Sequence, residues 1–368
     1  MSTRRRFLLL LVLLLGVTGA PAPRPPVARG AILPAALPGH WVAPDSQTAS
    51  DIHTVACPTP TVCYATAAQG TIIGTTDGGR TWTGLLAGAD PGPWGLACPS
   101  ATTCLAGSER NFHILRTTDG GRTWDLVYRP PLTSMDDVDG SGTGPNFYLL
   151  GLYGATCPTA RICLLVGTVG HVYRTTDGGT TWAVRAGEYS DTPQAVGTSR
   201  QAVLSDVSCP VVGTCYTVGI LCNCSPPHHV ATGGEIALSA DGGASWRSRT
   251  IATILQGLTC SDARTCLAVG LNGTILRTTD GGRTWPAVPN PLAGGTTNLY
   301  AVACAGGVCR AVGGGANNQG GVVLRSADGG RTWRREAVPT AASLDAIACP
   351  RADRCYLGGA AGALLVGS

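Results

Sequence analysis

The octapeptide T-T-D-G-G-R-T-W at Thr75–Trp82 decides the fold, because the chain repeats it. Related octapeptides stand at Thr117–Trp124, Thr175–Trp182, Ser239–Trp246, Thr278–Trp285 and Ser326–Trp333. Each copy follows a short run of aliphatic or β-branched residues, and all six copies end in a tryptophan. This pattern predicts a hairpin turn between two strands.

The residue types of the octapeptide suit a turn that is held by its own hydrogen bonds. The aspartate can accept hydrogen bonds from the backbone N–H groups of the turn, and the two glycines can adopt positive φ. The tryptophan supplies a large apolar ring that can be buried between neighbouring sheets. We therefore assign a structural role to the aspartates of the six copies, Asp77, Asp119, Asp177, Asp241, Asp280 and Asp328.

The S/T-x-D-G-G-x-T-W pattern resembles the Asp-box (BNR) repeat of sialidase-like β-propellers. The form R-T-T-D-G-G-R-T-W is most similar to the photosystem II assembly and stability factor family (Ycf48/Hcf136-like). The resemblance covers nearly the whole chain after its N-terminal leader. It implies a β-propeller in which the repeat is structural, and a function of holding a client protein, as the assembly factors do.

The N-terminus has the features of an export signal, which we assign to residues 1–22. Arg4, Arg5 and Arg6 precede an apolar core from Phe7 to Val17, followed by small residues. Both the Sec and the twin-arginine routes fit this segment, and an uncleaved signal would tether the protein to a membrane. Residues 23–38, rich in Pro and Ala, form a spacer. We expect a secreted or otherwise extracytoplasmic protein.

Fourteen of the 16 cysteines form seven close pairs, six of which share one spacing. In an exported chain this regular, even set predicts disulfides, since an isolated pair offers zinc only two of its four ligands. Closing so short a loop stabilises the fold by about 2 kcal/mol at most. The pairs are Cys57–Cys63, Cys98–Cys104, Cys157–Cys163, Cys209–Cys215, Cys260–Cys266, Cys304–Cys309 and Cys349–Cys355.

Each repeat reads as a strand that ends at a cysteine, a clipped loop, two further strands, the octapeptide, and a fourth strand. Seven cysteine pairs but only six octapeptides are present, because the last unit stops near Leu364–Val366. Trp41 stands where a fourth strand would begin. We therefore predict an all-β, seven-bladed β-propeller of four-stranded antiparallel blades over residues 39–368, closed by the N-terminal strand joining the last blade.

The charge balance gives no case for nucleic-acid binding. Every one of the 26 basic residues is Arg, and without Arg4, Arg5 and Arg6 there are 23 basic against 22 acidic side chains. We expect no nucleic-acid partner.

The longer insertions fall between blades, at Asp125–Tyr148 and Arg185–Leu204, or between the second and third strands of a blade, at Ile220–Gly233 and Gly313–Gly321. They therefore lie on one face of the disc. Loops carry variable function on repeated scaffolds, so we expect binding on this face. Asp136, Asp137 and Asp139 offer oxygen ligands of the kind Ca²⁺ prefers, but the segment lacks the bidentate glutamate and the spacing of a calcium loop, so a solvated acidic loop is the simpler interpretation. A second set of binding candidates is the arginine that recurs before the octapeptide, at Arg116, Arg174, Arg277 and Arg325.

Two further groups are weaker candidates for chemistry. Cys222, Cys224, His228 and His229 could hold zinc or copper, with a local disulfide as the simpler interpretation. Glu109 and Glu235 lie near second-to-third turns and are candidate carboxylates for glycoside hydrolysis.

The sequence favours an exported, monomeric binding or scaffold module for a protein or glycan partner, without a cofactor. The alternative is a glycoside hydrolase of the sialidase-like type.

Overall fold

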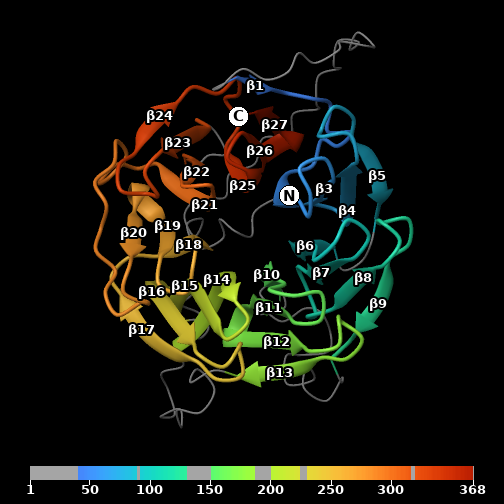
Figure 1. The fold of residues 1–368 in the computed structure, drawn as a ribbon, viewed down its shortest axis with the longest axis horizontal. Coiled ribbons are helices and arrows are strands. Elements are labelled where there is room, and N and C mark those ends of the chain that lie inside the picture. The colour runs from blue at the N-terminus through green and yellow to red at the C-terminus, as the bar shows by residue number, and fades with distance from the viewer. Residues whose placement is uncertain are drawn as a thin grey trace.

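The computed structural model describes residues 40–88, 92–130, 151–186, 200–223, 230–315 and 320–367, and the structural statements below concern these ranges. Seven antiparallel sheets stand in a ring around a central axis (Figure 1). The chain is thus a seven-bladed β-propeller, as predicted.

The strands follow one another as meanders from the axis outward. Blade one comprises β2 (Ile52–Ala56), β3 (Cys63–Ala67), β4 (Thr71–Thr75) and β5 (Thr83–Leu86). Blade two comprises β6 (Pro93–Ala97), β7 (Cys104–Ser108), β8 (Ile114–Thr117) and β9 (Asp125–Tyr128). Blade three comprises β10 (Leu152–Thr156), β11 (Cys163–Gly167), β12 (His171–Thr175) and β13 (Ala183–Ala186). Blade four comprises β14 (Arg200–Val211), β15 (Thr214–Asn223), β16 (Val230–Ser239) and β17 (Arg247–Ile251), and blade five comprises β18 (Leu255–Cys260), β19 (Cys266–Gly270) and β20 (Ile275–Thr278). Blade six comprises β21 (Asn298–Ala305), β22 (Val308–Gly314), β23 (Val322–Ser326) and β24 (Arg334–Glu336). Blade seven comprises β25 (Leu344–Arg351), β26 (Arg354–Gly359), β27 (Leu364–Gly367) and β1 (Trp41–Val42). Short 3₁₀ helices, η3 (Thr168–Gly170), η4 (Leu271–Gly273) and η5 (Ala360–Gly362), join second to third strands in three blades. No helix among the described residues is long and apolar enough to cross a membrane.

Blade five departs from the predicted four strands, because its sheet contains only β18, β19 and β20. The segment after Trp285 still runs beside β20, through a bridge between Leu276 and Ala287. Pro286 has no N–H group, so it cannot donate a hydrogen bond to β20. Its carbonyl oxygen accepts one from the N–H of Arg277. Proline therefore reduces the outermost strand of this blade to isolated contacts.

The strand β1 lies at the outer edge of blade seven. Trp41 pairs with Gly367 and Val42 with Val366 of β27 in an antiparallel register. The ring of Trp41 is 9% exposed, and the guanidinium carbon of Arg310 lies 5.5 Å from its centroid. The first strand of the domain and the last therefore belong to one sheet.

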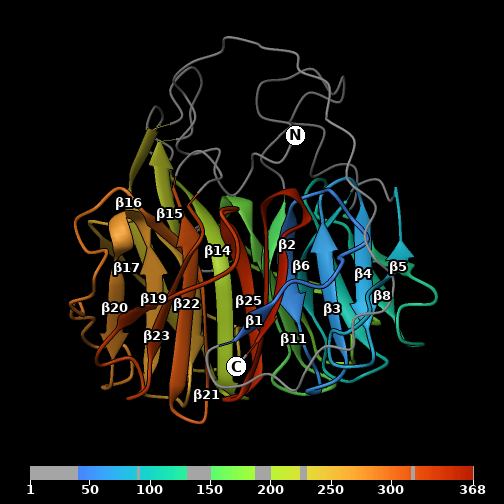
Figure 2. The same ribbon diagram turned by 90° about the horizontal axis from the view of Figure 1, so that it is seen from above.

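Blade four is taller than its neighbours. Its first three strands have 12, 10 and 10 residues, and β15 and β16 project beyond the other blades on one side of the disc (Figure 2). Parts of two predicted loops, from Arg185 to Leu204 and from Ile220 to Gly233, are therefore strand. β-Branched and aliphatic residues such as Val203, Ile220 and Leu221, which favour strands, account for the extension.

The two faces of the disc differ in structure. We call the face that carries the cysteine loops and the octapeptide turns the turn face, and the opposite face the connection face. All seven predicted disulfides are present. In each of the six blades with an octapeptide, the N–H of its first glycine donates to a carbonyl oxygen of the cysteine loop in the same blade, as Gly329 does to Gly307 at 2.9 Å. The turn face is therefore cross-linked within every one of these blades.

The second glycine of each turn packs against the preceding blade. A Cβ on Gly79, which has a φ of +81°, would lie 2.8 Å from Cε1 of Tyr356 in blade seven. On Gly179 it would lie 2.7 Å from Cδ2 of Leu105 in blade two. The repeated glycine pair thus has two causes, positive φ and the close approach of a neighbouring blade.

Candidate functional site

The innermost strands line a central channel. Every one of them is interrupted by a β-bulge opposite the second strand, which accommodates an extra residue, near the start of the strand in six blades and in the middle of the longer β14. In blades one to three these residues are aromatic: the ring of His53 stacks on Trp94 at 3.7 Å, and Trp94 meets Tyr153 edge-on at 5.5 Å. These three rings join the first three blades at the inner edge of the disc.

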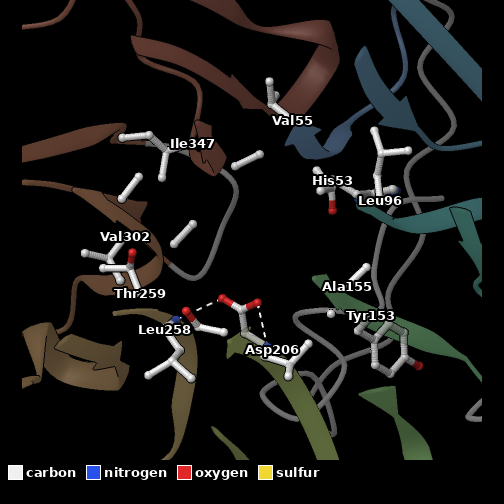
Figure 3. Close-up of a pocket in the computed structure, with 17 residues that line it drawn as sticks. His53, Val55, Leu96, Tyr153, Ala155, Asp206, Leu258, Thr259, Val302 and Ile347 are labelled. Carbon is white, nitrogen blue, oxygen red and sulfur yellow. Dashed lines mark hydrogen bonds between the residues drawn. The ribbon is translucent and has the colours of Figure 1, made fainter. Parts of the chain in front are cut away.

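The channel itself is narrow, and its wall combines apolar side chains with polar ones (Figure 3). Its volume is about 240 Å³, and residues such as Val55, Leu96, Leu258 and Val302 form its wall. Asp206 is the one carboxylate of the wall among the described residues. Its oxygens accept hydrogen bonds from the N–H groups of Val207 at 2.8 Å and of Leu258 at 2.9 Å, so this carboxylate joins blades four and five.

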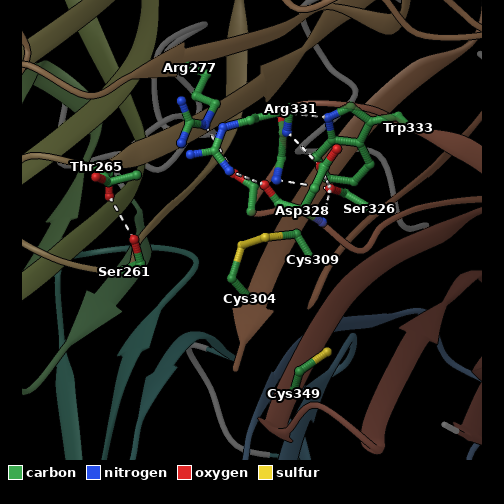
Figure 4. Close-up of a disulfide and its surroundings, with 12 residues drawn as sticks. Ser261, Thr265, Arg277, Cys304, Cys309, Ser326, Asp328, Arg331, Trp333 and Cys349 are labelled. Atoms are coloured by element: carbon green, nitrogen blue, oxygen red, sulfur yellow. Dashed lines mark hydrogen bonds between the residues drawn. A yellow bond between two sulfur atoms is a disulfide. The ribbon is translucent and has the colours of Figure 1, made fainter. Parts of the chain in front are cut away.

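A second hollow lies on the turn face, between blades five and six (Figure 4). Its volume is about 460 Å³, within the range of about 300–1,000 Å³ that ligand sites occupy, whereas the channel falls below that range. We call this hollow the blade 5/6 cleft. The Cys304–Cys309 loop on its wall has one residue fewer than the other clipped loops, and its tip is Gly306-Gly307, without side chains to fill the space.

Two arginines line the blade 5/6 cleft. Nε of Arg277 donates to the carbonyl oxygen of Gly329 at 3.0 Å, and Nη1 of Arg331 donates to that of Asp328 at 2.8 Å. Partial burial, and then the positive charge of Arg331, lower the pKa of Arg277. Arginine stays charged at neutral pH, so two like charges lie at the edge of one cleft and favour an anion between them.

Two nearby carboxylates, Asp328 and Asp262, partly balance these positive charges, because burial and Arg331 lower the pKa of Arg277 while both carboxylates raise it. The carboxylate of Asp328 accepts hydrogen bonds from the N–H groups of Arg331 and Thr332 and from the hydroxyls of Ser326 and Thr332. The hydroxyl of Thr332 and then its N–H lower the pKa of Asp328 well below its usual value. The same pattern of a hydroxyl two residues before, and an N–H and hydroxyl four residues after, holds in all six turns. In all six turns the aspartate thus accepts its hydrogen bonds from the turn itself.

The four arginines before the turns do not form one cluster. Nε of Arg174 donates to Gly242 of the next blade at 2.9 Å, just as Arg277 donates to Gly329. Nε of Arg116 is buried and has no hydrogen-bond partner among the described residues. Arg325 lies in β23 of blade six, and the next blade, blade seven, has no octapeptide turn for it to contact. Only Arg277 faces a second arginine within the next turn, since blades three and four have Thr180 and Ala244 at the place of Arg331.

The candidate carboxylates for hydrolysis are not brought together. Glu235 lies within β16, opposite Thr250, and is 4% exposed. Glu109 follows β7 and has Arg110 at 3.4 Å. Blade three separates the two blades that carry them.

The remaining candidates lie mostly outside the described residues. This holds for Asp136, Asp137 and Asp139, and for Cys224, His228 and His229. The backbone of Cys222 lies in β15, opposite Ala231. Within the part of the chain that the structure describes, no group of three or more His, Cys, Asp or Glu side chains could hold a metal ion.

Sequence reasoning did not find the blade 5/6 cleft, although a signal was present. The cleft lies on the turn face, whereas the sequence led us to expect binding on the connection face, which carries the longer insertions. One cysteine pair is one residue closer than the other six, and an arginine stands both before and inside the adjoining turns. A shortened loop beside two cations was the observation to follow.

Comparison with known proteins agrees with the fold. No protein-family model and no curated protein sequence matches the chain. Among solved structures, it is similar to Ycf48 bound to D1 peptide, with a TM-score of 0.64 and 19% identity over 92% of this chain and 99% of that one. It is similar to Ycf48 from Cyanidioschyzon merolae, with a TM-score of 0.63 and 19% identity over 89% and 98%. It also resembles a GH74 xyloglucanase from Xanthomonas campestris, with a TM-score of 0.61 and 17% identity over 88% of this chain but 53% of the enzyme. The chain therefore has the propeller fold that Ycf48 and the GH74 enzymes share.

Proposed function

We propose that this protein is an exported binding propeller that holds an acidic segment of a partner protein in the blade 5/6 cleft. The observation that carries the proposal is the pair Arg277 and Arg331 at the edge of a cleft of about 460 Å³. Guanidinium groups bind carboxylates through paired, charge-assisted hydrogen bonds. A partner with Asp or Glu side chains, or a free C-terminus, fits this chemistry.

Two other facts support the proposal. The loops around the cleft are held by disulfides and by the turn's own hydrogen bonds, so little conformational entropy is lost on binding. Ycf48, a propeller of similar fold, has been solved with a bound D1 peptide. A propeller of this size can therefore present a surface to a peptide.

Export is the second part of the proposal. The N-terminal leader supports it, and disulfides in such number are typical of proteins that fold in an oxidising compartment. We propose that the protein acts as a monomer outside the cytoplasm, either free or tethered through its leader.

Fluorescence anisotropy with a labelled oligoglutamate peptide tests the binding. Arg331→Gln should weaken binding by about tenfold, since a hydrogen bond to a charged group contributes about 1.5–3 kcal/mol. Arg334→Gln changes an exposed arginine of β24 outside the cleft and is the matched control. Equal affinity for all three proteins, or an equal loss in both variants, would refute the proposed site.

A further inference from the structure

The Cys209–Cys215 loop, on the turn face of blade four, has an apolar tip. Val211 and Val212 are 46% and 48% exposed, and they are two of the four large apolar side chains that stand out into solvent among the described residues. The side chains of Leu126 and Val184, the other two, lie on outer strands. An adjacent exposed pair on a clipped loop is therefore particular to blade four.

Val211 stands two residues after the first cysteine of its loop, where four other loops have a side chain that accepts hydrogen bonds from their own backbone. At the same place, Thr59 accepts hydrogen bonds from the N–H groups of Thr61 and Val62, at 3.4 and 3.0 Å. Three other loops repeat this arrangement with Ser100, Thr159 and Asp262. Blade four closes its loop in another way, because Val211 is the last residue of β14 and pairs with Thr214 of β15. A valine cannot accept the side-chain hydrogen bonds of the other loops, and it exposes apolar surface instead. This strand pair holds the loop whatever side chains stand at its tip, so the fold does not require two exposed valines there.

Charged groups and the cleft surround this tip. The N–H of Gly242 donates to Gly213 beside Val212, and Arg174 donates to the carbonyl oxygen of that same Gly242. On the other side, Oη of Tyr216 donates to Ala263 at 2.8 Å, and Ala263 belongs to the loop whose residues Ser261 and Thr265 line the cleft. One loop therefore separates the valine pair from the blade 5/6 cleft.

We infer that Val211 and Val212 form an apolar contact for the partner segment, which has apolar side chains next to its acidic ones. This inference rests on the proposed function and names the class of partner. The acidic groups would occupy the cleft, and the apolar groups would cover the valine pair, with Arg174 at its edge. An entirely apolar segment would leave the arginines without counter-charges, and an entirely acidic one would leave the valines exposed.

Anisotropy with two labelled peptides of equal negative charge tests this inference on the full chain. One peptide alternates glutamate with leucine, and the other has serine in place of leucine. Val211→Thr/Val212→Thr keeps the shape of both side chains and leaves the strand pair of residues 211 and 214 in place, so the thermal midpoint should not fall. The variant should bind the leucine peptide about tenfold more weakly, from the loss of roughly half-exposed valine surface at about 25 cal/mol per Å². Its affinity for the serine peptide should be unchanged.

Val184→Thr, on an outer strand and 42% exposed, is the matched control and should bind both peptides like the unchanged protein. The inference is overturned if the preference for the leucine peptide survives in the valine-pair variant, or if the unchanged protein shows no such preference. The proposed function still stands in that case, provided that binding of both peptides depends on Arg331. If neither peptide depends on Arg331, the proposed function itself fails. Sedimentation with phosphatidylglycerol vesicles that requires the valine pair, without any leucine preference, would assign the tip to a lipid surface and also overturn the inference.

Discussion

Oη of Tyr356, in the last blade, donates a hydrogen bond of 2.7 Å to the carbonyl oxygen of Pro60 in the first blade. Tyr64 and Tyr216 make the same bond from blade one to Ala101 of blade two and from blade four to Ala263 of blade five. The junction between the ends of the chain is thus built like the junctions between blades that follow one another in sequence. Three of the seven junctions, including the one between the two ends of the chain, therefore share this hydrogen bond.

Removing this hydrogen bond should destabilise the ring. Tyr356→Phe keeps the aromatic packing and should lower the free energy of unfolding by about 1 kcal/mol, the usual net contribution of one hydrogen bond. Denaturant unfolding followed by tryptophan fluorescence measures the change. Tyr216→Phe should lower the free energy of unfolding by the same amount within error. A loss for Tyr216→Phe with none for Tyr356→Phe would mean that the last junction does not contribute in the way its geometry indicates.

A methyl group on the second glycine of a turn should be tolerated badly. In Gly79→Ala the backbone has a φ of +81° and the new Cβ would lie 2.8 Å from both Tyr356 and Val366. We expect a loss of more than about 1 kcal/mol in unfolding free energy, from strain at positive φ together with the displaced neighbours. Gly84→Ala, in the exposed strand β5 with no atom within 4 Å of the new Cβ, is the control and should be close to neutral. Similar values for the two variants would contradict the packing argument.

How far the sequence predicts this molecule can be judged from these same residues. The octapeptide carries its own hydrogen-bond partners within a few positions, so the turns and the cysteine loops follow from local pattern. The contact of Gly79 with Tyr356 does not, because it joins residues at opposite ends of the chain. The blade 5/6 cleft depends on such contacts too, since Arg277 and Arg331 meet only once two blades have packed. The missing strand of blade five follows from Pro286, whose effect on the ladder the repeat pattern conceals.

Acid should destabilise the turns. The N–H of Thr123 and then its hydroxyl lower the pKa of Asp119 to about 2, from a model-peptide value of about 3.9. Because the pKa is lower in the folded state, the ionised aspartate stabilises the fold above pH ~4, and this contribution is lost as the pH falls toward ~2. The other five turn aspartates shift in the same direction. Thermal midpoints measured from pH 6 to pH 2 should be level at first and then fall below pH ~4.

Asp119→Asn provides the matched test of that pH dependence. The variant should be less stable at pH 6 and should approach the unchanged protein near pH 2, where the native carboxyl is losing its charge. A constant difference between the two proteins over the whole range would show that the charge of Asp119 does not contribute.

The most direct test of the account is the position at which an acidic segment touches the protein. A glutamate–leucine peptide that carries a benzophenone group at one end can be crosslinked to the full chain, and the attached residues identified by mass spectrometry. We predict crosslinks on the turn face, within the Cys209–Cys215, Cys260–Cys266 and Cys304–Cys309 loops, that disappear with Arg331→Gln. Crosslinks confined to the connection face, and unaffected by Arg331→Gln, would contradict it.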